Sequence, residues 1–192
     1  MRALLLLALS LVLSLPALAQ ANEGIALGLE VNADYRIEND RTLAFGNGGS
    51  LRLGYQYPNG LTPQLLVTGA YWSGAEGTGT ARLDVSGYAA LGLVGLRWNL
   101  LPDLRSGVAP WLALNLGGGL LGSSAGAVSD TQLGLAVVGG LGLDFPIPTG
   151  GADGIAVGTH VTYNRLVLED KAGVAQGVTW LVIGADLSLV FQ

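Results

Sequence analysis

Residues Leu181 to Phe191 read Leu-Val-Ile-Gly-Ala-Asp-Leu-Ser-Leu-Val-Phe. Every second residue of this stretch, counted from Leu181, is apolar. The intervening positions include Gly184, Asp186 and Ser188, although two valines dilute this second face. Alternation with a period of two predicts a strand with two unlike faces. A strand of this length that ends on an aromatic residue is typical of the wall of a transmembrane β-barrel.

The beginning of the sequence has the three parts of an export signal. Arg2 supplies a positive charge, residues 3–15 are almost entirely apolar, and residues 16–19 contain a small-x-small cleavage site. The apolar core is shorter than the roughly 20 residues that a membrane-spanning helix needs. We therefore expect residues 1–19 to be a cleaved signal peptide and residues 20–192 to form one outer-membrane β-barrel domain.

The composition of the chain excludes several classes of protein. Charged residues make up 12% of the sequence, which is about half their usual share in a soluble domain. A net charge of −5 argues against nucleic-acid binding, which needs a clustered basic surface. The absence of cysteine excludes a disulfide scaffold and a thiolate metal site. An exported chain with little charge and no helical span fits a barrel in an outer membrane.

Eight segments of the sequence alternate with a period of two. They are residues 24–35, 50–57, 61–72, 83–99, 109–121, 132–145, 154–166 and 181–191. The fourth changes phase near Leu93 and Val94, which predicts either a bulge or a long protruding strand. An even number of segments predicts an all-β fold, an eight-stranded antiparallel up-and-down transmembrane β-barrel.

The connections between these segments alternate in character. Longer polar stretches follow the odd-numbered segments, at residues 36–49, 73–82, 122–131 and 167–177. Tighter turns rich in Pro, Asn, Asp and Gly follow the even-numbered ones, at residues 58–60, 101–107 and 146–153. Long loops on one side and short turns on the other are the outer-membrane arrangement. We expect the long loops to face outward and both termini to face the periplasm.

Aromatic residues gather near the ends of the segments. Amphipathic rings at the two membrane interfaces produce such a pattern, whereas a soluble core places its large rings in the middle of strands. The predicted outer belt contains Tyr35, Tyr71, Trp72, Tyr163 and Trp180, and the predicted inner belt contains Tyr57, Trp98, Trp111, Phe145 and Phe191.

The main rival interpretation is a secreted soluble β-barrel or sandwich. Its polar face would meet water and would be rich in Lys, Glu, Gln and Thr. Here that face contains mainly Gly, Ala, Ser, Thr and Asn, and the single lysine, Lys171, falls in a predicted loop. Small residues suit the interior of a narrow eight-stranded barrel, so the transmembrane interpretation is preferred.

Several charges lie on the face that would line the lumen. They are Glu30, Arg52, Arg97, Asp144 and Asp186. Isolated charges in a narrow lumen are costly, so we expect them to pair. Arg52 can meet Glu30 or Asp186, and Arg97 can meet Asp144. The pattern favours a plug of side chains, with a gated or slowly conducting polar path as the alternative.

His160 is the only histidine, and Thr162, Glu169 and Asp170 follow it. A histidine, a hydroxyl and a carboxylate can form a hydrolytic triad, and outer-membrane lipid A deacylases use such a set on an eight-stranded barrel. Thr162 stands where that family has serine, and the surrounding residues do not match its motif. His160 also shares the lumen-facing phase. We therefore expect a polar lumen residue, and we expect no enzyme, no cofactor and no bound metal.

These features together resemble the small outer-membrane β-barrel superfamily, which includes the OmpA transmembrane domain and OmpX-like proteins. The resemblance rests on the signal peptide, the eight alternating segments, the aromatic belts and a final strand that ends near Phe191. It implies contact with outer-membrane lipid and insertion by the barrel-assembly machinery, which recognises a terminal strand ending in an aromatic residue. Many members are surface or structural proteins without enzymatic activity.

The expected function is therefore a structural or adhesive role at the outer membrane, exercised through the outer loops by a monomer with a filled lumen. A small-solute pore is the alternative, and a lipid A-modifying enzyme is a third interpretation. The sequence names no extracellular ligand.

Overall fold

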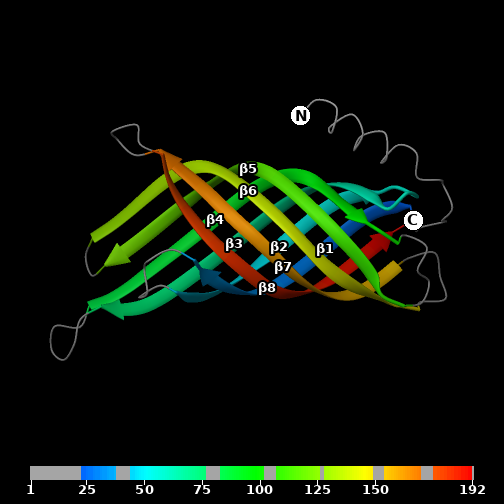
Figure 1. Ribbon diagram of the computed structural model, residues 1–192, viewed down its shortest axis with the longest axis horizontal. Coiled ribbons are helices and arrows are strands. Elements are labelled where there is room, and N and C mark those ends of the chain that lie inside the picture. The colour runs from blue at the N-terminus through cyan, green and yellow to red at the C-terminus, as the bar shows by residue number, and fades with distance from the viewer. Residues whose placement is uncertain are drawn as a thin grey trace.

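Within the residues that the structure describes, the chain forms eight β-strands (Figure 1). The structure is a computed structural model, and it describes residues 23–37, 44–76, 83–101, 107–125, 128–148, 154–169 and 175–191. The strands are β1 (Gly24–Arg36), β2 (Phe45–Gln56), β3 (Leu61–Glu76), β4 (Leu83–Asn99), β5 (Ala109–Ala125), β6 (Val128–Ile147), β7 (Gly154–Glu169) and β8 (Ala175–Phe191). These residues include no helix long and apolar enough to cross a membrane. The predicted signal peptide, residues 1–19, lies outside them.

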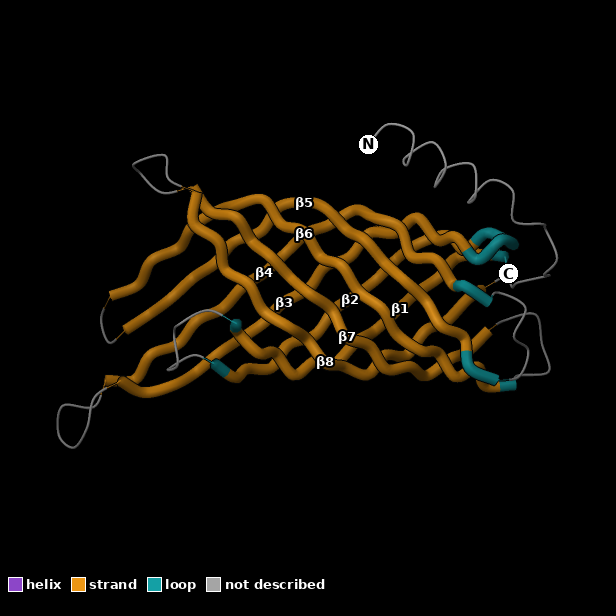
Figure 2. Tube along the Cα trace, in the orientation of Figure 1, coloured by secondary structure: helices purple, strands orange, loops and turns teal. Residues whose placement is uncertain are grey.

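Each strand pairs antiparallel with the next along the chain, and β8 pairs with β1 to close the barrel (Figure 2). This confirms the predicted eight-stranded antiparallel barrel. The register along each ladder is continuous, without a bulge. Following the paired residues once round the barrel from Ala26 leads to Arg36, not back to Ala26. This stagger tilts the strands against the barrel axis.

The two faces of the wall are those that the alternation predicts. In β1, Leu29 and Val31 are exposed on the outer surface, whereas Glu30 between them and Asp34 further along the strand are buried in the lumen. In β8, Ile183 and Leu187 are exposed and Asp186 is buried. The exposed apolar side chains form the surface that lipid covers in a transmembrane barrel.

The predicted phase change in β4 does not occur. The pairing of β4 with β3 and with β5 is continuous from end to end, and Ala89, Leu91, Leu93 and Arg97 all point into the lumen. The bulge prediction was wrong because both faces of this strand are apolar near Leu93, so periodicity alone could not tell them apart. The strand is long and regular, which was the other predicted outcome.

Strands, rather than long loops, make up much of the end away from the termini. Residues 122–131, predicted as a loop, are mostly a β5–β6 ladder that extends to the pair Ala125↔Val128. The β3–β4 ladder likewise extends to Glu76↔Leu83, whereas β1 and β2 part at Tyr35↔Phe45. Strands β3 to β6 therefore reach further than β1 and β2 at this end (Figure 1).

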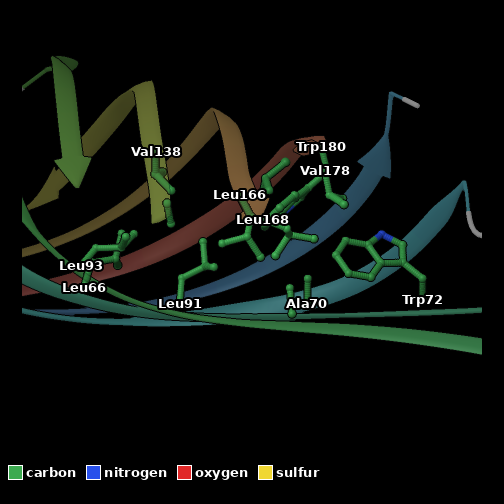
Figure 3. Packing of buried hydrophobic residues seen from close by; sticks show 13 residues of the cluster. Leu66, Ala70, Trp72, Leu91, Leu93, Val138, Leu166, Leu168, Val178 and Trp180 are labelled. Carbon is green, nitrogen blue, oxygen red and sulfur yellow. The ribbon is translucent and has the colours of Figure 1, made fainter. Parts of the chain in front are cut away.

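The lumen is filled differently in its two halves. We call the half nearer the two termini the inner half, and it contains the charged residues. The outer half contains a cluster of buried apolar side chains from opposite walls (Figure 3). Its members are Leu66, Ala70, Trp72, Ala89, Leu91, Leu93, Ala136, Val138, Leu166, Leu168, Val178, Trp180 and Val182.

Candidate functional site

The inner half of the lumen brings together the charged side chains that the sequence singles out. They come from six strands and all are buried: Glu30 on β1, Arg52 on β2, Arg97 on β4, Asp144 on β6, His160 on β7 and Asp186 on β8. We refer to these six residues as the lumen charge cluster.

One pair of the cluster lies near the inner mouth of the barrel. Arg97 Nη2 donates a hydrogen bond to Asp144 Oδ2, and Trp111 Nε1 donates one of 3.0 Å to Asp144 Oδ1. The guanidinium carbon of Arg97 lies 4.0 Å from the centroid of the Trp111 ring. Asp144 thus accepts a hydrogen bond on each oxygen, and Arg97 has both a charged partner and an aromatic face, as a buried ion pair requires.

The second pair lies at the junction of β1, β2 and β8. Arg52 Nη1 lies 3.6 Å from Glu30 Oε1, and Arg52 Nη2 donates a hydrogen bond of 2.6 Å to Ser188 Oγ. Ser188 Oγ in turn donates to Asp186 Oδ2 over 3.1 Å. Arg52 therefore contacts one of its two predicted partners directly and reaches the other through a hydroxyl group.

His160 lies among oxygen atoms rather than beside a nucleophile. Its Nε2 is 3.1 Å from Asn32 Oδ1, and its Nδ1 is 3.6 Å from Asp186 Oδ1. Thr162 Oγ1 accepts a hydrogen bond of 3.1 Å from Asn164 Nδ2. The structure therefore does not form the nucleophile–base contact that a His–Thr hydrolytic pair would need.

Glycines on the lumen face make room for the cluster. A Cβ atom on Gly28 would lie 2.7 Å from the Arg52 guanidinium, and one on Gly184 would lie 2.6 Å from the His160 ring. These glycines therefore leave space for the long side chain of a neighbouring strand. A lumen-phase glycine beside a large polar residue on the next strand is a sequence signal that can locate such a site.

Three tryptophans assigned to the interface belts lie inside the barrel instead. Trp72, Trp111 and Trp180 are all buried, so this assignment is wrong for them. Trp72 and Trp180 meet edge to face in the outer half, with ring centroids 5.6 Å apart, and Arg36 lies over the Trp72 ring. Their positions in the alternation place them on the lumen face, and that phase outweighs their position at a strand end.

The remaining belt residues lie on the outer surface or at its edge. Tyr35, Tyr57, Tyr71, Tyr163, Phe145 and Phe191 are exposed, and Trp98 is half-buried. Two further rings join the outer belt: Tyr88, which pairs with Tyr71, and Phe45, whose ring lies 5.0 Å from that of Tyr35. Phe45 begins β2, whereas the sequence predicted a loop at residues 36–49.

The residues that the structure describes contain no group of three or more His, Asp or Glu side chains placed to hold a metal ion. The groups of the cluster form salt bridges and hydrogen bonds with one another.

No protein-family model matches the chain, and no curated protein sequence is detectably similar to it. Solved structures are similar. Neisserial surface protein A (NspA) has a TM-score of 0.54 at 14% identity, covering 88% of this chain and 97% of that one. Ail, the attachment invasion locus protein of Yersinia pestis, has a TM-score of 0.50 at 17% identity, covering 86% and 99%. The outer membrane protein OprG from Pseudomonas aeruginosa has a TM-score of 0.46 at 13% identity, covering 88% and 97%.

The chain thus has the fold of the small eight-stranded outer-membrane β-barrels. At these levels of identity the likeness concerns the fold, because one barrel architecture supports several unrelated functions.

Proposed function

We propose that this chain is an integral protein of a bacterial outer membrane that acts by contact at the cell surface, with a lumen closed by its own side chains. The fold that it shares with NspA and Ail and the export signal predicted at residues 1–19 support this location. Ail is by name an attachment and invasion protein, which favours a surface-contact role for a barrel of this shape.

The observation that carries this proposal is a sheet that rises beyond the outer aromatic belt. The β3–β4 ladder continues past the belt pair Tyr71↔Tyr88, and β4 and β5 remain paired as far as Val85↔Ala125. Ser86 and Ser124 Oγ atoms lie 2.7 Å apart between these two strands. Small polar residues of this kind suit a sheet in water rather than in lipid.

The outer part of β6 adds a feature that favours protein contact. Among the described residues, its backbone pairs with β5 as far as Val128, whereas its pairing with β7 begins at Gly134. A strand segment that is paired on one side only favours association with another chain.

The packing of the lumen supports a closed barrel over the pore alternative. Leu91 and Leu166 are almost completely buried in the outer half, and Arg97 and Trp111 stack in the inner half. We expect the purified protein to give no steady single-channel conductance in planar bilayers. Steady conductance would overturn the closed-barrel part of the proposal.

The surface role is tested by removing the sheet while keeping the barrel. The trimmed variant replaces residues 73–86 and 122–131 each with an Asn-Gly turn, so that Trp72↔Gly87 and Leu121↔Gln132 become the last pairs. Bacteria that produce the full chain are expected to adhere to cultured epithelial cells several-fold more than bacteria with an empty vector. The trimmed variant is expected to fall to the vector level.

A control must show that the trimmed variant still folds in the membrane. Its accessibility to protease at the cell surface and the resistance of its folded barrel to detergent are therefore compared with those of the full chain. Equal adherence of bacteria with the full chain, the trimmed chain and the empty vector would overturn the surface role.

A further inference from the structure

Two carboxylates face each other at the seam where the barrel closes. Glu30 on β1 and Asp186 on β8 are direct register partners, and both are buried. Like charges directly opposite on adjacent strands are destabilising, and burial increases that cost. Arg52 contacts Glu30 but reaches Asp186 only through Ser188. A second cation near Asp186 would offset this repulsion at the seam.

The His160 imidazole lies between these two carboxylates. Its Nε2 is 3.9 Å from Glu30 Oε2, and its Nδ1 is 3.6 Å from Asp186 Oδ1. The side chain is 1% exposed. On β8 its register partner is Gly184, which leaves space for the ring.

A chain of hydrogen bonds fixes the role of Nε2. Thr68 Oγ1 donates to the carbonyl of Gly49 over 3.4 Å, and Ser50 Oγ donates to Thr68 over 3.0 Å. Asn32 Nδ2 donates to Ser50 over 3.3 Å. The oxygen of Asn32, which can only accept, therefore faces His160 Nε2 at 3.1 Å. Because its partner is an acceptor, Nε2 must carry a proton.

The other ring nitrogen also faces an acceptor. Asp186 Oδ2 accepts a hydrogen bond from Ser188, and its Oδ1 faces His160 Nδ1. Neither His160 Nδ1 nor Asp186 Oδ1 has another hydrogen-bond partner among the described residues. A neutral imidazole with its proton on Nε2 would direct a lone pair at this carboxylate, whereas an imidazolium donates from both nitrogens.

The charges that surround the imidazole agree with a cation at this position. The groups are Glu30 from β1, Asp186 from β8, Asp144 from β6, Arg52 from β2 and Arg97 from β4. From β5 the neighbour is the Trp111 ring, with its centroid 6.2 Å from that of the imidazole. A protonated histidine makes the lumen charge cluster neutral, with three anions and three cations.

We propose that His160 is a buried proton-binding site, and that the bound proton joins β1 and β8 by giving Glu30 and Asp186 a shared cation. An imidazole in an unfolded chain loses its proton at about pH 6.5. In the folded barrel the imidazolium lies at the closing seam between the two carboxylates, and its removal is expected to lower the free energy of unfolding because a buried carboxylate loses its cation.

The experiment uses the single histidine of the chain as its own probe. The full-length barrel, without a histidine tag, is labelled with ¹⁵N-histidine and reconstituted in lipid nanodiscs. Its NMR spectrum is recorded at about pH 7.5, which is about one unit above the pKa of a free imidazole. The expected result is a proton on both ring nitrogens. A neutral ring with one protonated nitrogen at this pH would overturn the proposal.

Variants test the role of the seam. In Asp186→Asn and Glu30→Gln the share of rings with a proton on both nitrogens is expected to fall at the same pH, and Asp130→Asn, on the outer part of β6, is the matched control with no expected change. The urea midpoint of His160→Gln is expected to be clearly lower than that of the natural chain, and that of Asp130→Asn to be unchanged. If a variant fails to fold, the imidazolium signal of the natural chain still tests whether His160 carries a proton on both ring nitrogens. Equal urea midpoints for His160→Gln and the natural chain would overturn the role of the cation in closing the barrel.

Discussion

The inner and outer halves of the lumen are enclosed by the same eight strands, yet they are filled by opposite means. In the inner half, each charged group is matched to a partner, as Asp144 is matched to Arg97 and Trp111. In the outer half, side chains such as Leu91 and Leu166 pack without any directional bond. Charged contacts depend on particular partners, whereas apolar contacts depend on volume. The two halves should therefore respond differently to substitution.

The largest effect is expected from Arg97→Ala, which leaves Asp144 buried without its cation. Loss of one partner of a buried pair costs about 3–5 kcal/mol, and urea titration of the barrel in detergent micelles measures this free energy of unfolding. The double variant Arg97→Ala/Asp144→Ala should lose less than the single variant, because no unpaired charge remains. Strictly additive losses would contradict the assignment of specific pairing to the inner half.

In the outer half, Leu166→Ala is expected to lower the free energy of unfolding by about 2–4 kcal/mol, because it leaves a cavity among packed side chains. Leu114→Ala is the matched control, since Leu114 is 57% exposed on the lipid-facing surface. Its loss should be clearly smaller in the same titration. An equal loss at both positions would show that the outer half is loosely packed.

The smallest effects sharpen the comparison, because the same substitution is made in both halves. Trp111→Phe removes the hydrogen bond to buried Asp144 and should cost about 1–3 kcal/mol. Trp72→Phe should cost about 1 kcal/mol or less, since the Trp72 Nε1 has no hydrogen-bond partner among the described residues and only its ring contact with Trp180 is weakened. Equal costs in urea titration would contradict the distinction between directional and non-directional filling.

The faces of the strands could be predicted from the sequence because a membrane wall imposes a strict period of two. Leu29 and Glu30 were separated correctly on this ground alone. The same rule places Trp111 and Trp180 on the lumen face, since their neighbours in phase are Ala113 and Val182. The prediction is wrong for them because the phase of a ring, rather than its position at the end of a strand, decides which face it occupies.

Other features depend on partners that a single strand does not reveal. Leu91 and Leu93 lie in the lumen, although nothing in their own segment distinguishes them from lipid-facing leucines. Residues 122–125 and 128–131 are mostly small or polar, which does not favour a strand, and they are strand because β5 and β6 pair there. The position of His160 between Glu30 and Asp186 depends on the closing register of β8 with β1.

The unbroken register of the wall restricts how such a chain can change in length. With no bulge in the paired strands, one inserted residue would turn the rest of its strand inside out, exposing a residue such as Asp186 to acyl chains. Substitutions keep the two faces of the wall intact. Insertions of two residues also keep them, but they shift the strand against both neighbouring strands. We therefore expect related proteins to differ in length at the connections between strands, while the wall itself diverges in side chains only.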